Sequence, residues 1–165
     1  MSLYVIMKLL HVLAAFWFIS GVIGRDLTFW QAGKATNVHA VYSLLQVSDF
    51  FERYAVIPVS MIVFLFGLII TILQRWPLFG FLQGSRSNWL LISFILFVGV
   101  SVVIGPLRLP ARRKERARAT EEALAQGIIT PALTTALHDQ VVVRFRMVEL
   151  IALVIVIVLM VAKPL

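Results

Sequence analysis

Four long apolar runs divide the chain, and each is close to the length that a helix needs to cross a bilayer. They cover residues 3–24, 56–73, 88–107 and 141–162, and a transmembrane helix requires roughly 20 residues. Backbone N–H and C=O groups in lipid must be satisfied within the segment, so each run is predicted to be helical. The pattern therefore predicts an all-α, polytopic membrane protein built as a four-transmembrane-helix bundle.

A less apolar but still patterned segment, Arg25–Arg53, separates the first two runs. Trp30, Val38, Val41 and Leu45 share one helical stripe, and polar residues lie opposite. This pattern predicts an additional amphipathic helix after the first span. Such a helix either lies at the membrane interface or extends the bundle into the cytoplasm and packs against it.

The most hydrophilic segment, LRLPARRKERARATEEALAQG, follows the third run. It predicts a basic cytoplasmic helix from Arg112 to Gln126 between spans three and four, with Gly127 as its stop. Within the third run, Ser101 and Gly105 have the small-xxx-small spacing that suits close helix packing.

Composition and charge agree with the membrane interpretation. The 165 residues are 61% hydrophobic and 14% charged, which indicates one membrane domain spanning residues 1–165. The loops after the first and third runs, together with Arg144 and Arg146 at the start of the last run, carry 11 of the 15 lysines and arginines. The positive-inside rule then places these loops in the cytoplasm and both termini outside, as in a multi-pass protein of the bacterial inner membrane. No aromatic residues interleave with the arginines, so nucleic-acid binding is not expected.

Two ionisable side chains lie inside the first run, where each costs several kcal/mol unless it meets a partner, a cavity or a ligand. Lys8 and His11 share a helical stripe with Arg25. His11 is either hydrogen-bonded to a neighbouring helix or an axial haem ligand or proton relay. Lys8 either pairs with a haem propionate or extends to the outer headgroups.

Other charged and aromatic positions have a structural as well as a functional interpretation. Glu149, inside the last run, is either ion-paired with Arg53 or Arg146 or a proton-accepting carboxylate. Trp17 is either a packing or lipid-facing aromatic or part of a cofactor pocket. Four charges at the inner ends of the first two spans are expected to neutralise one another at the headgroup level: Arg25, Asp26, Glu52 and Arg53.

Metal sites and the common soluble catalytic motifs are absent from the sequence. There is no cysteine, and the three histidines have no metal-ligand spacing. His39 and His138 are predicted on the cytoplasmic side, so they cannot join His11 on one iron within a subunit. No Walker loop, dinucleotide glycine pattern, HExxH or GxSxG occurs.

Three blocks in order resemble a group of small bacterial membrane proteins. They read KLLHVLAAFWFISGVIGRD, FERYAVIPVSMIVFLFGLIIT and RFRMVELIALVIVIVLMVAKP. The group includes the copper-resistance-D-like proteins and the J-type protoporphyrinogen oxidases. Within it, the chain most resembles an uncharacterised branch, a predicted integral membrane family.

The resemblance implies roles for particular residues. In the oxidases, the first-span histidine is associated with haem b, which corresponds to His11 here. Their arginine closing the first span matches Arg25, and the arginine-then-glutamate entry to the last span matches Arg146 and Glu149. The oxidases also carry a histidine and a lysine early in the third span, where this chain reads NWLLISFILFVGV. Porphyrinogen oxidation is therefore disfavoured, and ligation of one iron by two histidines of the same subunit is not expected. Met61 or Met147 is either a substitute axial ligand or, as is usual for methionine in an apolar helix, a packing residue.

These observations lead to one principal hypothesis and two alternatives. The first is a small integral membrane protein that binds haem b and has a redox or tetrapyrrole-related role. Its candidate cofactor-binding residues are Lys8, His11, Trp17, Arg25, Arg146 and Glu149, and no catalytic residue is assigned. The alternatives are a non-enzymatic metal- or ion-handling protein and an accessory subunit of a larger membrane complex. The expected partners are the lipid bilayer and either a second copy or such a complex.

Overall fold

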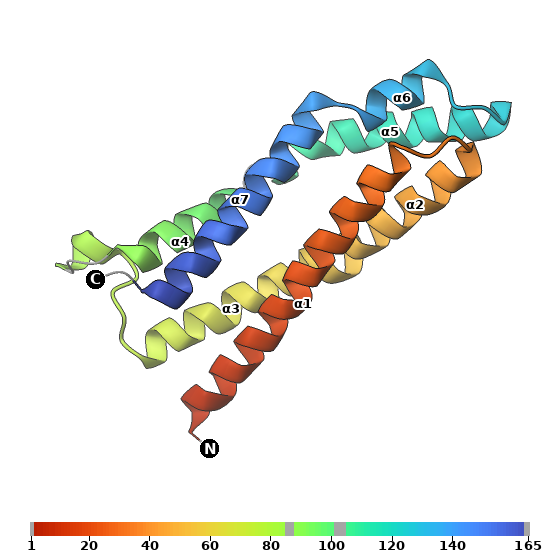
Figure 1. Cartoon of the computed structure of the whole chain (residues 1–165). Helices are drawn as coiled ribbons and strands as arrows, with labels where there is room; N and C mark the ends of the chain where they lie inside the picture. The colour runs from red at the N-terminus through yellow and green to blue at the C-terminus, as the bar shows by residue number, and fades with distance from the viewer. Residues whose placement is uncertain (1, 85–87, 101–104, 164–165) are drawn as a thin grey trace. The chain divides into compact units, whose positions relative to one another are not determined.

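The computed structural model describes residues 2–84, 88–100 and 105–163, and its regular elements in these ranges are all helical (Figure 1). In chain order, the elements are α1 (Leu3–Ala32), α2 (Val38–Phe51), the π-helical turn η1 (Glu52–Val56), α3 (Ile57–Leu73), the 3₁₀ turn η2 (Gly80–Gln83), α4 (Trp89–Val98), α5 (Gly105–Gln126), α6 (Pro131–Leu137) and α7 (Gln140–Ala162).

Three helical stretches are long and apolar enough to cross a membrane: Leu3–Ala32, Val38–Leu73 and Pro131–Ala162. The span predicted over 88–107 begins as α4, which is apolar but has only 10 residues. That prediction continues over residues 101–104, which lie outside the described residues, as does the proposed packing role of Ser101. The structure thus establishes an all-α protein with three candidate spans.

The first helix is longer than the apolar run that predicted it. α1 continues through Arg25 to Ala32, giving 30 residues and about 45 Å. A hydrocarbon core is about 30 Å thick, so the last part of α1 extends beyond it. The helix therefore extends past Gly24, the predicted end of the first span. The helix continues because Arg25, which ended the apolar run, is buried and ion-paired.

The predicted amphipathic helix is an extension of the second span. α2 begins at Val38, where the Asn37 side chain accepts a hydrogen bond from the backbone N–H of His39 at 2.8 Å. It then continues through η1 into α3, forming one helical stretch. Val38, Val41 and Leu45 form its buried face, as predicted. Trp30 does not belong to that face, because it lies on α1 and is exposed.

The π-helical turn η1 lies directly before a proline. Pro58 has no backbone N–H, and its ring clashes with the carbonyl of the preceding turn, so the regular hydrogen-bond ladder fails there. The helix forms a π-helical turn there, in which the N–H of Ile57 bonds to the carbonyl of Glu52, five residues earlier. The break in the hydrogen-bond ladder at Pro58 is accommodated by this π-helical turn.

The chain divides into two compact units. The first comprises Met1–Leu73 and Arg113–Asp139, and the second Gln74–Arg112 and Gln140–Leu165. In the first unit, α1 packs along α2, η1 and α3 as an antiparallel hairpin (Figure 1). In the second, α4 packs against α7.

Part of the first unit's core comes from helices beyond the hairpin. The buried apolar residues include Phe29 and Ala32 at the end of α1, Ala123 on α5, and Leu133 on α6. The predicted basic helix is present within α5, which ends at Gln126. Gly127 follows with a positive φ of 69°, a backbone conformation that glycine adopts without steric cost. The predicted stop is therefore confirmed.

Candidate functional site

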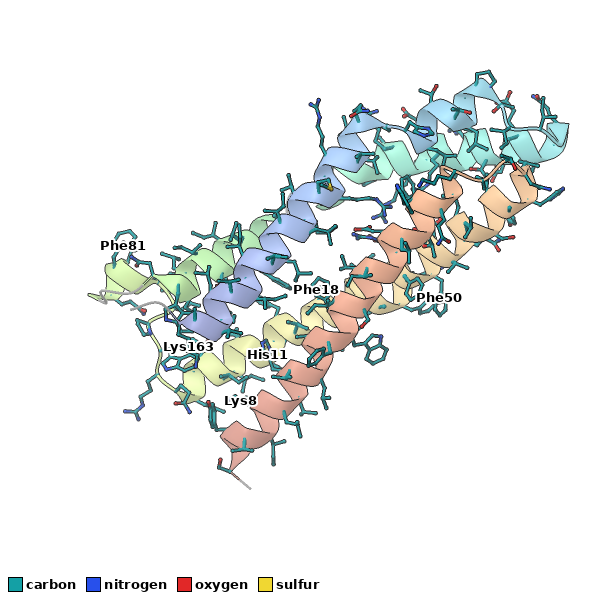
Figure 2. The ribbon with its side chains drawn as sticks, in the orientation of Figure 1. Lys8, His11, Phe18, Phe50, Phe81 and Lys163 are labelled. Carbon is teal, nitrogen blue, oxygen red and sulfur yellow. The ribbon has the colours of Figure 1, made fainter. Side chains whose placement is uncertain are left out.

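His11 lies on α1 and its side chain is held by α3. Its Nδ1 is 2.9 Å from the carbonyl oxygen of Val63. A carbonyl oxygen only accepts hydrogen bonds, so Nδ1 carries the proton, and Nε2 of the neutral ring keeps its lone pair. The hydrogen bond to a neighbouring helix, one of the alternatives that the sequence left open for His11, is present. Figure 2 labels His11 between the ribbons of the two helices.

A glycine on α3 makes room for this ring. A Cβ placed on Gly67 would lie 3.1 Å from Cε1 of His11 and 4.0 Å from its Nε2. The first distance is tighter than ordinary van der Waals contact, so a larger residue would press on the imidazole. The half-buried ring is thus oriented by its hydrogen bond to Val63 and by close packing against Gly67.

Lys8 lies one turn from His11 toward the N-terminus (Figure 2). Its side chain is exposed, and its Nζ is 6.0 Å from the centre of the Tyr4 ring. This distance is at the outer limit of a cation–π contact. The ammonium group therefore remains available to a headgroup or to an acidic group bound beside His11.

The remaining candidate residues do not gather around His11 within the first unit. Trp17 is 61% exposed, and six residues along a helix place it on another side of α1. Arg25 lies about 21 Å farther along α1 and is engaged in ion pairs. Arg146 and Glu149 are on α7 in the second unit. Glu149 is buried, as expected for a residue facing another helix.

A buried ion-pair network occupies the level at which the apolar run of α1 ends. Arg25 is 4% exposed. Its Nε donates to Asp26 at 2.8 Å, and its Nη1 donates to Glu52 at 2.8 Å. The sequence prediction that these charges neutralise one another is confirmed for this trio. Arg53 does not take part in these bonds, and its guanidinium lies 5.8 Å from the ring of Tyr54.

Helix α5 extends the network with two arginines that sequence reasoning did not connect to it. Arg113 donates to the other carboxylate oxygen of Glu52, and Arg116 donates to Asp49 at 2.9 Å. The two acids and the two arginines each have i, i+3 spacing, which places each pair on one helix face. That matching spacing was the signal in the sequence. We name these residues the ionic network: Arg25, Asp26, Asp49, Glu52, Arg113 and Arg116.

Arg116 is a buried member of the network, whereas the side chain of its partner Asp49 is 63% exposed. Burial lowers the pKa of the Arg116 guanidinium, and the Asp49 carboxylate acts in the opposite direction. The guanidinium also lies 5.3 Å from the centre of the Phe29 ring, a cation–π contact. Arginine remains protonated in proteins, so Arg116 is a buried cation that depends on its partners.

The described side chains include no group of three or more His, Cys, Asp or Glu residues that could hold a metal ion. His39 and His138 are both exposed. The Nδ1 of His138 bonds to the carbonyl of Thr134 at 3.0 Å, within its own helical segment. Of the three histidines, His11 is the one whose side chain forms a hydrogen bond from one candidate span to another, from α1 to α3.

Comparison with known families gives the membership of the chain. A family model described as "Predicted integral membrane protein (DUF2269)" matches residues 5–164. The chain belongs to this family. As a member of the DUF2269 family with three candidate spans, it is an integral membrane protein in contact with lipid. Neither the curated proteins nor the solved structures compared with it gave a match.

Proposed function

We propose that this DUF2269 protein binds haem b in the membrane, with Nε2 of His11 as an axial ligand and a redox or tetrapyrrole-related role. The observation that carries the proposal is the 2.9 Å bond between His11 Nδ1 and the Val63 carbonyl. Metal-ligating histidines in proteins commonly donate their other ring N–H to a carbonyl or carboxylate, which fixes the tautomer and the ring orientation.

His11 would bind the haem iron through Nε2, and its neighbours would hold the ring in place. Val63 holds the proton on Nδ1, and Gly67 lets the ring pack without a clash. The exposed ammonium of Lys8, one turn away, can pair with a propionate near the end of the span. Haem supplies one-electron redox chemistry when bound. The chain's own contribution is to orient the ligand, to neutralise the acidic edge and to exclude water with apolar side chains.

The sequence resemblance supports the same position. The first-span histidine of the J-type oxidases corresponds to His11. The proposed relationship to that group and the local geometry therefore both favour His11 as the haem ligand. Arg25 is a weaker candidate, because its donors serve Asp26 and Glu52. Trp17, Arg146 and Glu149 stay candidates from the sequence. A methionine or a group from a partner would have to supply any second axial ligand.

Removal of His11 is expected to abolish haem binding. The measurement is the oxidised and dithionite-reduced absorption spectrum of protein purified in detergent after expression with a haem precursor. The wild type should show a Soret band that shifts on reduction, and His11→Ala should lose it. His39→Ala is the matched control, because His39 is exposed and lies on α2. A colourless wild type, or an unchanged spectrum in His11→Ala, would contradict the proposal.

We also propose that the chain crosses the membrane four times, with both termini outside. The support is the apolar α4, which packs against α7, and the excess of basic residues in the loops after the first and third runs. Alkaline phosphatase fused after Leu165 should therefore be active, and green fluorescent protein fused there should remain dark. The same fusions after Gln126 should give the reverse pattern. Cytoplasmic behaviour of the C-terminal fusions would overturn this topology.

A further inference from the structure

The charges of α5 are separated along the helix in an unusual direction. Residues 112–118 contain five basic residues and one acid, Glu115, whereas residues 119–126 contain two acids, Glu121 and Glu122, and no base. The helix macrodipole favours acids near the N-terminus and bases near the C-terminus. This part of α5 has the opposite order. The macrodipole therefore does not explain the distribution of charges along the helix, and an interaction with groups outside the helix is needed to explain it.

The ionic network fixes the level of the basic part relative to the membrane. The apolar run of α1 from Leu3 to Gly24 is about 32 Å long at 1.5 Å per residue, which matches a hydrocarbon core of about 30 Å. Arg25 directly follows and so lies at headgroup level. Glu52 bonds to both Arg25 and Arg113. The basic part of α5 therefore also lies at headgroup level.

The same contacts give the direction in which α5 runs. Arg113 bonds to Glu52, and Arg116, three residues later in α5, bonds to Asp49, three residues earlier than Glu52. The helix is therefore antiparallel to α2 and leads away from the hydrocarbon core. Glu122 lies about 9 Å beyond Arg116 along the axis. The bases are placed beside the headgroups and the acids at a distance from them.

Two of the basic residues face away from the ionic network. Lys114 and Arg118 are both exposed, and their i, i+4 spacing puts them on one face of α5. Arg113 and Arg116 are turned toward Glu52 and Asp49 on the other face. In the described part of the chain, neither Lys114 nor Arg118 has an ion-pair partner.

We propose that Lys114 and Arg118 form a binding site for the phosphate of an anionic phospholipid. An anionic leaflet attracts basic residues placed at its surface and repels acids, which is the arrangement along α5. Arginine and lysine are the usual phosphate-binding side chains. The exposed Glu115 lies between them in sequence. This inference is independent of haem binding.

The test uses the full-length protein in detergent, titrated with dioleoyl-phosphatidylglycerol or dioleoyl-phosphatidylcholine and measured by native mass spectrometry. The wild type should bind the anionic lipid more tightly. Lys114→Gln and Arg118→Gln should each weaken that binding on the order of five-fold and leave phosphatidylcholine binding unchanged.

Lys34→Gln is the matched control, because it also removes one positive charge but acts at the far end of α1. The Nζ of Lys34 is 3.3 Å from the centre of the Trp30 ring, and Lys34 lies beyond the last residue of α1. It should leave phosphatidylglycerol binding at the wild-type level. Equal binding of the two lipids by the wild type would overturn the proposal. So would equal weakening by Lys34→Gln and Arg118→Gln, because net charge alone would then explain the effect.

Discussion

Replacing Glu52 by Gln is expected to lower the free energy of unfolding by about 3–5 kcal/mol, the usual cost of removing one partner of a buried ion pair. The Glu52 side chain is 14% exposed and bonds to Arg25 and Arg113 at once. Arg25, at 5% side-chain exposure, would keep its charge but lose its ion pair with Glu52. Unfolding by titration of the purified protein with sodium dodecyl sulfate provides the measurement.

Arg53→Gln is the control for this substitution. Arg53 is the next residue in η1 and its replacement also removes a charge, but Arg53 is exposed and its guanidinium lies 5.8 Å from the centre of the Tyr54 ring. Its replacement should change the unfolding free energy by less than about 1 kcal/mol. The double variant Glu52→Gln with Arg113→Gln should be less destabilised than the sum of the single variants, because the pair is coupled. An unfolding curve of Glu52→Gln that matches that of Arg53→Gln would show that the ionic network does not stabilise the fold.

Replacing Gly21 by Val should also be strongly destabilising. A Cβ at Gly21 would lie 2.6 Å from the Cβ of Ala55 and 3.3 Å from its backbone carbonyl carbon. The obstruction is not a flexible side chain, so α1 and η1 would have to move apart. Forced overpacking of this kind costs about 1–3 kcal/mol, and a branched side chain is at the upper end. Thermal unfolding in detergent, followed by circular dichroism, is the readout.

A second helical glycine provides the comparison for Gly21. Within the described residues, nothing lies within 4 Å of a Cβ built on Gly99. Gly99→Ala should therefore leave stability unchanged or raise it by up to about 1 kcal/mol, because alanine has the higher helix propensity. Gly21→Ala should lower stability. If both alanine variants had the same effect, the close approach of α1 to η1 would not be a determinant of the fold.

Much of the architecture follows from local properties of the sequence. Apolar length predicted α1, α3 and α7, and the polar segment ending at Gly127 predicted most of α5. Helical spacing also predicted the buried face of Val38, Val41 and Leu45. These features depend on hydrophobic periodicity, segment length and turn-forming residues, all of which are local properties of the sequence.

The features that were missed depend on contacts between distant segments. The extension of α1 past Gly24 could not be read from hydropathy, because the charge of Arg25 is neutralised by Glu52, 27 residues away. The roles of Arg113 and Arg116 require the register of α5 on α2. For the candidate site, the sequence identified His11 from the cost of burying an imidazole. It could not identify Val63, because a backbone carbonyl has no signature in the sequence.

The central claim is that Nε2 of His11 is an axial haem ligand, and imidazole rescue tests it most directly. His11→Gly removes the side chain beside Gly67 and leaves room for a free imidazole. The measurement is the reduced-minus-oxidised difference spectrum of His11→Gly, purified with and without imidazole. We predict no haem signal without imidazole and partial recovery with it. A wild-type protein that never acquires haem, or a His11→Gly variant whose signal is intact without imidazole, would contradict the account.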